Sequence, residues 1–354
     1  MKIHIFNPEH DLALAFGGKY FTAPAAGRDM RASLAYLPLW WADEDDVLLV
    51  DDEASARRAS LPFENFLPNV KLIEKRHLAD WMPDCQTSEM VVDPWGWNAA
   101  LCGELSRAGC PSALLPDKKM IAAVRDLSHR QSSITLLKEV TDGLDMTVGE
   151  RFVAHSLEET RELVGKNPRS VLKMPWSSSG RGIRYVRGFL TNNEEGYVAN
   201  VLKNQGSILV EPYYDRVMDF AMEFLADGKG GVSFLGLSLF DTFNGAYLGN
   251  LLAPEETKRE LLAQYLPLPL LDTVTQRLVK KLGVWCNHIY HGPLGVDMMV
   301  VCAEGDRRLL HPCVEVNLRR TMGHVALHVA ERTGWQFHAM HVTGKKGKFI
   351  LSLT

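Results

Sequence analysis

The strongest constraint on the fold is the segment Cys313–Arg319, in which apolar and polar side chains alternate strictly. Its apolar set is Val314, Val316 and Leu318, and its polar set is Glu315, Asn317 and Arg319. A period of two is typical of a β-strand with one buried face. Residues 295–301, just before it, are more apolar and contain one acid, Asp297. Turn-forming residues at 303–307 separate the two runs, so the sequence predicts an antiparallel hairpin.

The register of this hairpin decides whether its acids meet. A hairpin centred on Asp306 places Asp297 opposite Glu315, with Asn317 two residues along on the same face. Two opposed like charges destabilise a sheet, whereas Mg²⁺ is bound by carboxylate and amide oxygens. The pattern therefore indicates a metal site. A solvated face with ordinary carboxylates is the alternative, and a register shifted by one residue would separate the pair.

Composition and charge exclude several classes of protein. The 354 residues are enough for two or three domains, and 46% hydrophobic with 23% charged residues is ordinary for a globular protein. A net charge of −4 without a basic block argues against a nucleic-acid partner. No apolar run is long enough to span a membrane, and Lys2–Phe6 resembles a strand rather than a signal peptide. The six cysteines form no C-x-x-C pair, so we expect a reducing, cytoplasmic compartment.

The first 115 residues predict a parallel α/β layer, because short apolar strands alternate with helical segments. The predicted strands are residues 2–6, 46–51, 70–73, 90–93 and 111–116, with a helix over 99–108. The polar loops 7–11 and 95–98 would then lie at the carboxyl ends of strands, where open α/β sheets bind ligands.

The alternation of short strands and helices ends near Pro116, and we expect two further domains, residues 116–212 and 213–354. The first would contain helices at 118–127 and 132–140, a helix opened by the capping box Ser156–Glu159, and strands at 170–174, 183–186 and 207–211. This pattern predicts a small α+β lid. The second would contain strands at 219–225 and 232–239, helices at 255–264 and 271–288, the hairpin, and a last helix at 323–332.

Lys173 ends one of the lid strands and precedes a loop of small residues, 176–183. Exposed backbone N–H groups in such a loop can surround phosphate oxygens while the lysine supplies positive charge. The segment is neither a Walker A motif nor a G-x-G-x-x-G fingerprint. A hairpin turn without a ligand would use the same residues and is the alternative.

The apolar strand 208–211 ends in Glu211 and is followed by a proline-containing turn. An adenine ring needs an apolar slot with exposed backbone groups at its edge, and such a crossing supplies both. Asp219, eight residues later, could accept hydrogen bonds from ribose hydroxyls. A domain crossing with a surface acid is the alternative.

Taken in order, these segments resemble the ATP-grasp superfamily over about residues 112–332. The resemblance implies an α/β fold in which an N-terminal parallel domain precedes a two-part α+β ATP-grasp domain. It also implies a set of ligand contacts by family analogy. These are Mg²⁺ or Mn²⁺ ligands Asp297, Glu315 and Asn317; ATP contacts from Lys173, Ser178, Ser179, Gly180, Gly182, Glu211, Tyr213 and Asp219; and a substrate or phosphate contact from Arg319.

Two features depart from the family pattern. The family usually has another lysine some forty residues before the lid lysine, where this chain has Arg130. Arginine keeps the charge but prefers forked contacts with two oxygens. The lid loop is also richer in serine and poorer in glycine, which suggests a stiffer lid.

By the same resemblance, we expect a Mg²⁺- and ATP-dependent ligase, in which Lys173, Arg130 and Arg319 neutralise phosphate charge. A small-molecule carboxylate would be activated as an acyl phosphate and attacked by an amine or, less often, a thiol. Two alternatives stay open, a phosphotransferase with a hydroxyl acceptor and a nucleotide-binding module without turnover. The intact set of metal ligands argues against the second. A homodimer is also left open.

Several other features do not predict a site. The histidine pairs 324/328 and 288/291 lack a third ligand, so we do not expect zinc. Cys102 and Cys313 have no local base that would make either a nucleophile. The neighbouring Trp40 and Trp41 are expected in the core.

Overall fold

The computed structural model describes residues 1–82, 90–177, 182–243, 246–345 and 347–354. These residues form two compact units. Unit 1 contains Met1–Arg125, Leu248–Pro254 and Leu318–Thr354, and unit 2 contains Asp126–Tyr247 and Glu255–Asn317. The division into three domains at residues 115 and 212 stays a prediction.

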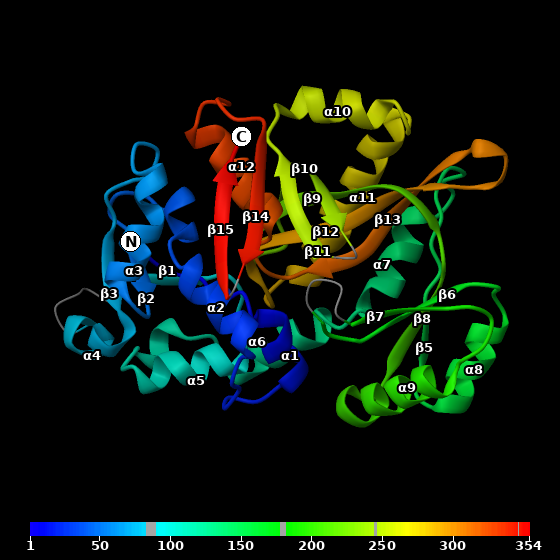
Figure 1. Cartoon of the computed structure of the whole chain (residues 1–354), viewed down its shortest axis with the longest axis horizontal. Coiled ribbons are helices and arrows are strands. Elements are labelled where there is room, and N and C mark those ends of the chain that lie inside the picture. The colour runs from blue at the N-terminus through cyan, green and yellow to red at the C-terminus, as the bar shows by residue number, and fades with distance from the viewer. Residues whose placement is uncertain (83–89, 178–181, 244–245, 346) are drawn as a thin grey trace. The chain divides into compact units, whose positions relative to one another are not determined.

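Unit 1 is built on a parallel sheet with the strand order β3-β2-β1-β4. Its strands are β1 (Lys2–Ile5), β2 (Val47–Val50), β3 (Lys71–Glu74) and β4 (Val91–Pro94), so the predicted parallel layer is confirmed. Alternate residues such as Ile3 and Ile5 pack into a core shared with Leu101 and Leu105 of α5 (Ala99–Arg107). Figure 1 shows this sheet in blue and cyan, with helices around it.

One predicted strand is wrong. Residues 112–114 form a short 3-10 helix, Ser112–Leu114, in place of the strand over 111–116. The amide of Leu114 donates to the carbonyl of Pro111 at 3.0 Å, and that of Leu115 donates to Ser112 at 3.2 Å. Proline has no backbone N–H, so the flanking Pro111 and Pro116 disfavour a sheet ladder here.

The rest of unit 1 is helical, apart from a small antiparallel sheet near the end of the chain. The α-helices are α1 (His10–Phe16), α2 (Ala25–Ser33), α3 (Glu53–Ser60), α4 (Leu78–Trp81), α6 (Lys118–Leu127) and α12 (Met322–Arg332). The short 3-10 helices are η1 (Leu37–Trp40), η2 (Leu61–Phe63) and η3 (Lys75–His77). In the small sheet β14 (Ala339–Lys345) pairs with β15 (Lys348–Leu353) and with the later residues of β11 (Ala246–Leu251). Trp40 and Trp41 are buried, as predicted.

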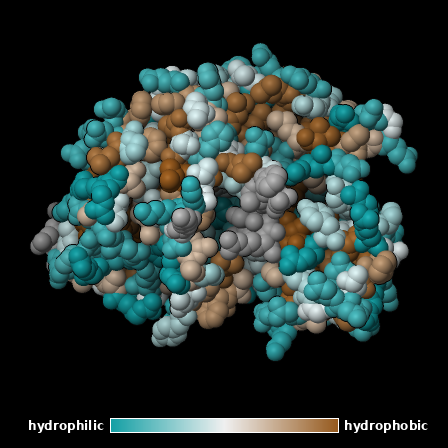
Figure 2. Space-filling view, in the orientation of Figure 1, coloured by the Kyte–Doolittle hydropathy of each residue, from teal (hydrophilic) through white to brown (hydrophobic). Residues whose placement is uncertain are grey.

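Unit 2 contains a small antiparallel sheet, here called the lid sheet, with the order β5-β8-β6-β7. Its strands are β5 (Phe152–Ala154), β6 (Ser170–Lys173), β7 (Ile183–Val186) and β8 (Ile208–Pro212). The helices α8 (Leu157–Gly165) and α9 (Asn192–Gln205) place Val164, Val198 and Val201 in its core. Their outer surface is largely hydrophilic in Figure 2.

Side-chain caps fix where these two helices begin. Ser156 accepts from the amide of Glu159 at 3.1 Å, while Glu159 accepts from the amide of His155 instead of closing the predicted box on Ser156. Thr191 and Glu194 form a complete capping box at the start of α9. Each cap satisfies amides that the first helical turn leaves without partners.

The second sheet of unit 2, here called the body sheet, contains β13-β12-β9-β10 in antiparallel order. Its strands are β9 (Asp215–Asp227), β10 (Val232–Phe243), β12 (His291–Cys302) and β13 (Arg308–Asn317), with the 3-10 turn η7 (Glu304–Asp306) between the last two. The associated helices are α7 (Ser132–Thr141), α10 (Glu255–Ala263) and α11 (Leu268–Cys286). Thr275 of α11 contacts Met222 of β9 at 3.3 Å, so α11 covers the face on which Met222 lies.

The predicted hairpin is present, and Asp297 pairs with Glu315, but a bulge produces that pairing. Near the turn Met299 pairs with His311, a register centred on Gly305 rather than Asp306. Between these pairs β13 carries two more residues than β12, and Pro312 lies in the extra stretch. Because proline cannot donate to the ladder, it fits such an irregularity.

Among the residues that the structure describes, no helix is both long and apolar enough to cross a membrane.

Candidate functional site

One face of the body sheet, here called the site face, carries polar side chains in register across β9, β12 and β13. Cross-strand pairing gives three rows, which are Asp219–Met299–His311, Ala221–Asp297–Glu315 and Glu223–Gly295–Asn317. Because side chains alternate along a strand, residues two apart in these strands share the face opposite Met222 and α11. The sequence-predicted metal ligands Asp297, Glu315 and Asn317 are therefore brought together.

The donor chemistry of this set suits a hard cation. Two carboxylates and an amide oxygen are ligands that Mg²⁺ accepts, and it usually keeps water in its remaining positions. No group of three or more His, Cys, Asp or Glu side chains is placed to hold a metal ion anywhere in the described ranges, and the site face offers two carboxylates with one amide. The suitability of this face for Mg²⁺ therefore depends on oxygen donors from β12 and β13, the two strands of one hairpin.

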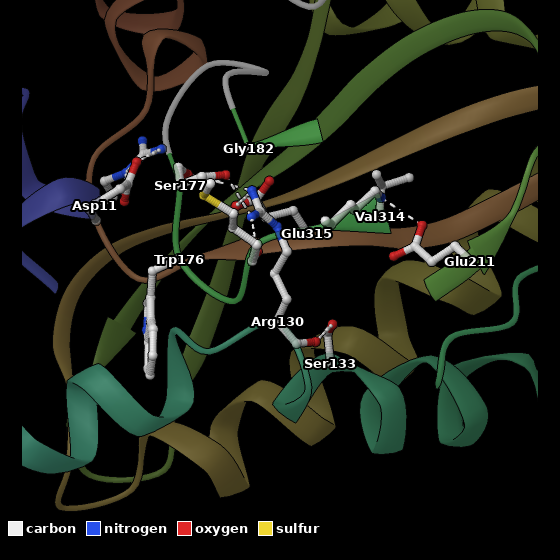
Figure 3. A network of polar contacts seen from close by, with 12 residues as sticks. Asp11, Arg130, Ser133, Trp176, Ser177, Gly182, Glu211, Val314 and Glu315 are labelled. Atoms are coloured by element: carbon white, nitrogen blue, oxygen red, sulfur yellow. Dashed lines mark hydrogen bonds and ion pairs between the residues drawn. The ribbon is translucent and has the colours of Figure 1, made fainter. Parts of the chain in front are cut away.

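Arg130, which lies between α6 and α7, reaches one of these predicted ligands (Figure 3). One terminal nitrogen of its guanidinium donates to Glu315 Oε1 at 2.7 Å. The other donates to Ser177 Oγ at 2.8 Å and to the carbonyl of Met174 at 2.5 Å. The forked contacts expected of arginine are thus made, and a cation reduces the repulsion between Glu315 and Asp297.

Lys173 and Glu211 meet inside the lid sheet. Lys173 Nζ lies 2.6 Å from Glu211 Oε2, and Arg151 Nε lies 2.5 Å from Glu211 Oε1. Burial alone would raise the pKa of Glu211, but Arg151 and Lys173 outweigh it and lower that pKa to about 2. Burial lowers the pKa of Lys173, and the attraction of Glu211 opposes that shift. The predicted phosphate lysine and hinge acid therefore form one buried charge cluster.

The segment after Glu211 leaves one backbone donor available. Tyr213 is fixed to the lid sheet, because its amide donates to Arg169 at 3.0 Å and its ring lies 3.5 Å from the Arg169 guanidinium. The next residue, Tyr214, accepts from the amide of Glu150 through its hydroxyl at 3.0 Å. Within the described part of the chain, its own amide N–H donates to no residue.

The predicted ribose contact already has protein partners. Asp219 accepts from Arg216 at 2.5 Å and from the Thr242 hydroxyl at 3.2 Å. Burial raises the pKa of Asp219, and the nearby Arg216 acts in the opposite sense. Its position in the row of Met299 and His311 places it two residues from the metal row along the strand.

Three predicted phosphate contacts, Ser178, Ser179 and Gly180, lie outside the described residues. Gly182 is described, and its carbonyl accepts from the amide of Met174 at 2.9 Å and from the Tyr197 hydroxyl at 2.9 Å. A Cβ atom on Gly182 would collide with the Ser177 side chain. Only glycine fits where the loop returns to β7.

Arg319 lies in unit 1 and binds Asp11 in the first turn of α1, so the loop predicted over residues 7–11 already ends at Glu9. Its Nε lies 3.0 Å from Asp11 Oδ1, and a terminal nitrogen lies 2.9 Å from Oδ2. The resemblance to ATP-grasp enzymes implied a substrate or phosphate contact for Arg319. The structure places its forked guanidinium at the carboxyl end of the parallel sheet.

The loops after β1 and β4 are bonded to each other at this end of the sheet. Asn7 donates to the carbonyl of Gly96 at 2.9 Å, and Asn98 lies 3.2 Å from His10 Nδ1. A Cβ atom on Gly96 would lie 2.6 Å from that imidazole nitrogen, so glycine is required. Burial lowers the pKa of His10 to about 4. Strand order reverses between β1 and β4, which is where such sheets bind ligands.

Two buried residues of the site were missed from sequence. Glu223 is 1% exposed and lies in the row of Asn317. Its spacing from Asp219, four residues along one strand, was a usable signal for the same face. Arg151 gave no local signal, because its partner Glu211 is sixty residues away.

Three residues that the sequence did not assign to a site, His324, His328 and Cys313, are packed within the fold. His324 lies beside the Thr321 hydroxyl at the start of α12, at 2.9 Å, and His328 packs beside the Trp41 ring at 6.3 Å. Burial raises the pKa of the Cys313 thiol to about 12, which opposes thiolate chemistry.

No protein-family model matches the sequence, and a search of curated proteins gives no match. Solved structures do match. N5-carboxyaminoimidazole synthetase from Staphylococcus aureus, complexed with ADP, is 11% identical over 97% of this chain and 82% of its own, with a TM-score of 0.52. N5-carboxyaminoimidazole ribonucleotide synthetase from Thermus thermophilus is 14% identical over 96% and 82%, also with a TM-score of 0.52. At this identity the likeness concerns the fold, and it confirms that this chain has the ATP-grasp fold.

Proposed function

We propose that the protein is a Mg²⁺- and ATP-dependent ligase that activates a substrate carboxylate as an acyl phosphate for attack by an amine or a thiol. One observation supports this above the others. Arg130 joins Glu315 on the site face to Ser177 and the Met174 carbonyl, so the metal donors adjoin the loop that follows Lys173. Hard-oxygen donors, two cations and a small-residue loop are what a metal-bound polyphosphate requires.

The lid sheet would hold the nucleotide. Lys173, Arg130 and the backbone around Gly182 would contact its phosphates, and Asp219 would accept from its ribose. The available amide of Tyr214, which follows Glu211, could donate to a ring nitrogen of the base. One of the two similar structures was solved with ADP, which agrees with nucleotide binding by this fold.

Asp297, Glu315 and Asn317 would hold the Mg²⁺ ion, which when bound neutralises phosphate charge. For Glu315 to serve as a ligand, its contact with Arg130 must loosen, and the arginine fork is then available for phosphate oxygens. The chain's own contribution is positioning and charge neutralisation in a buried site. No side-chain nucleophile is needed.

The carboxylate and amine substrates are small molecules in this proposal. Arg319 and the loops 7–11 and 95–98 are the proposed acceptor site, because they lie where strand order reverses in the parallel sheet. The Arg319 fork suits a carboxylate, and in the present structure it binds the carboxylate of Asp11.

An ATPase screen tests the proposal. The protein with Mg²⁺ and ATP is incubated with pooled carboxylates and amines, and products are identified by mass spectrometry, with Glu315→Gln as the matched control. A new amide formed together with ADP and phosphate, and absent from the control, supports a ligase. A stable phosphorylated product would instead indicate a phosphotransferase, and binding without turnover across the screen would indicate a nucleotide-binding module.

A further inference from the structure

Among the described residues, Arg151 is the most deeply buried cation near the proposed nucleotide site. It directly precedes β5, and its side chain is 0% exposed. Its Nε donates to Glu211, one terminal nitrogen donates to the carbonyl of Val314 at 2.6 Å, and the other donates to the carbonyl of Arg130 at 3.2 Å and to Ser133. A buried cation is costly unless such partners replace water. Each of the three guanidinium nitrogens has a hydrogen-bond partner, so the surrounding protein compensates for the burial of this charge.

The partners of Arg151 lie next to proposed functional residues. Val314 directly precedes Glu315, and the Arg130 carbonyl belongs to the residue whose side chain binds Glu315. Arg151 therefore joins the lid sheet to β13 and to the segment before α7. Taken alone, these contacts describe a brace.

The net charge of the cluster indicates a role beyond holding these elements together. Glu211 shares its two carboxylate oxygens, with Oε1 beside Arg151 and Oε2 beside Lys173. The cluster thus contains two cations and one anion, a surplus of one positive charge. All three side chains are buried, so solvent and salt screen that surplus weakly.

Without Arg151, Lys173 and Glu211 would form a neutral pair, and the carboxylate would compete with any phosphate for the ammonium group. A lysine has three N–H donors, and one of them suffices for the contact with Oε2 of the shared carboxylate. Sharing Glu211 therefore leaves both charge and donors of Lys173 for an anion. The hydrogen bonds to two backbone carbonyls fix the guanidinium, so it cannot move to the phosphate itself.

We propose that Arg151 is a positioning residue that shares Glu211 with Lys173 and so maintains a surplus positive charge for the nucleotide phosphates. This inference rests on the proposed function, because it assumes that a nucleotide binds beside Lys173. In this inference the charge of Arg151 acts through Glu211 and Lys173, and Arg151 itself does not contact the nucleotide.

Two ligands separate this role from that of a brace. MgADP carries phosphate charge, whereas adenosine offers the same base and sugar without charge. A brace affects both affinities alike, since it only holds the lid sheet in place. The proposed role changes the ratio of the MgADP affinity to the adenosine affinity.

Four proteins vary the surplus charge in single steps. The surplus is one in the wild type, zero in Arg151→Met, two in Glu211→Gln, and one in the double variant. We expect the affinity ratio, measured by titration calorimetry, to change by about tenfold per charge. It should fall in Arg151→Met, rise in Glu211→Gln, and return to within about threefold of wild type in the double variant.

Circular dichroism would establish that each variant is folded. If Arg151→Met does not fold, the step from Glu211→Gln to the double variant removes the same charge and still requires a tenfold fall. A constant ratio across all folded variants would overturn the inference while leaving nucleotide binding intact. Failure of the wild type to bind MgADP would instead overturn the proposed function, and the inference with it.

Discussion

Each unit buries a cluster of ionisable side chains, and the two clusters distribute their hydrogen-bonding partners differently. In unit 1, both ring nitrogens of His4 face carboxylates, Asp93 and Asp46, each at 2.9 Å. Arg320 donates to Asp93 at 3.0 Å, and the amide of Lys2 donates to Asp46 at 2.6 Å. Two acids thus meet an imidazole, a guanidinium and a backbone donor.

In unit 2 the partners are distributed differently. One carboxylate, Glu211, serves both Lys173 and Arg151, while Asp297 and Glu315 stand opposite each other on adjacent strands. Among the described residues, the cluster around Glu211 has one more cation than anion, and the site face has acids in register on two strands, an arrangement that suits a metal-bound polyphosphate. The unit 1 cluster joins β1 to β4 and to the residue just before β2, as expected of a structural element. A buried surplus of charge like that around Glu211 is typical of functional sites.

The largest effect is expected from breaking the cluster around His4 in unit 1. The substitution His4→Phe removes a fully buried partner of two acids and should lower the free energy of unfolding by about 3–5 kcal/mol. MgADP affinity of the folded protein should stay within about threefold of wild type. Urea denaturation and calorimetry measure the two quantities. As a matched control, Arg57→Ala breaks an exposed pair with Glu53 and should cost no more than about 0.5 kcal/mol.

A substitution at Glu315 on the site face should have the opposite pattern, with a large effect on turnover and a small effect on stability. Glu315→Gln keeps an acceptor oxygen for Arg130 but removes the charge proposed to bind Mg²⁺. Turnover should fall about a hundredfold or more, on the order of 3 kcal/mol. Unfolding should become easier by only about 1–2 kcal/mol, because Glu315 is 27% exposed and an amide can still accept. A variant with wild-type turnover would remove Glu315 from the site.

Part of the unit 2 site could be predicted from the sequence. The opposed Asp297 and Glu315 were predicted from alternation and turn residues, both local signals. Their pairing nevertheless depends on the bulge at Pro312, since the unbroken register of the hairpin tip would place Cys313 opposite Asp297. The helix start at Ser156 and strands such as β1 were likewise predicted from nearby residues.

Helix α9 was not predicted although its capping box is a local signal, but other unpredicted features depend on distant contacts. Arg151 acquires its role from Glu211, Val314 and Ser133, none of them adjacent in sequence. The strands β14 and β15 near the end of the chain were not predicted, and β14 is fixed partly by pairing with β11. A local pattern cannot reveal a partner supplied by a fold that is not yet known.

Ligand binding should sharpen the contrast by stabilising the protein through unit 2. MgATP at a hundredfold excess over its Kd should add about 2.7 kcal/mol to the free energy of unfolding, and ATP with EDTA should add less. Hydrogen exchange of the Trp176 and Ser177 amides should slow on binding, while that of β1 should change little. Equal stabilisation with and without metal would count against the Asp297, Glu315 and Asn317 site.

The smallest expected effect concerns acid sensitivity, which both units share through buried histidines. Burial lowers the pKa of His311 in unit 2 and of His328 in unit 1, each to about 3. Their unfolded pKa lies near 6.5, so below that pH the unfolded chain binds protons that the folded chain does not. These groups therefore stabilise the fold above pH 6.5, and that stability is lost as the pH falls towards 3.

Each such histidine contributes about 1.4 kcal/mol per pH unit in this window. His311→Leu should therefore reduce the slope of unfolding free energy between pH 4 and 6 by about that amount, measured by urea denaturation at several pH values. His328→Leu should do the same from unit 1, whereas Asp93 and Glu211, whose pKa values are about 2, should affect the slope only below about pH 4. An unchanged slope in His311→Leu would mean that this imidazole is protonated in the folded protein. Since neither ring nitrogen has a hydrogen-bond partner among the described residues, a charged His311 would have to find its counter-charge in Glu211, and this third cation would raise the surplus of the cluster from one positive charge to two.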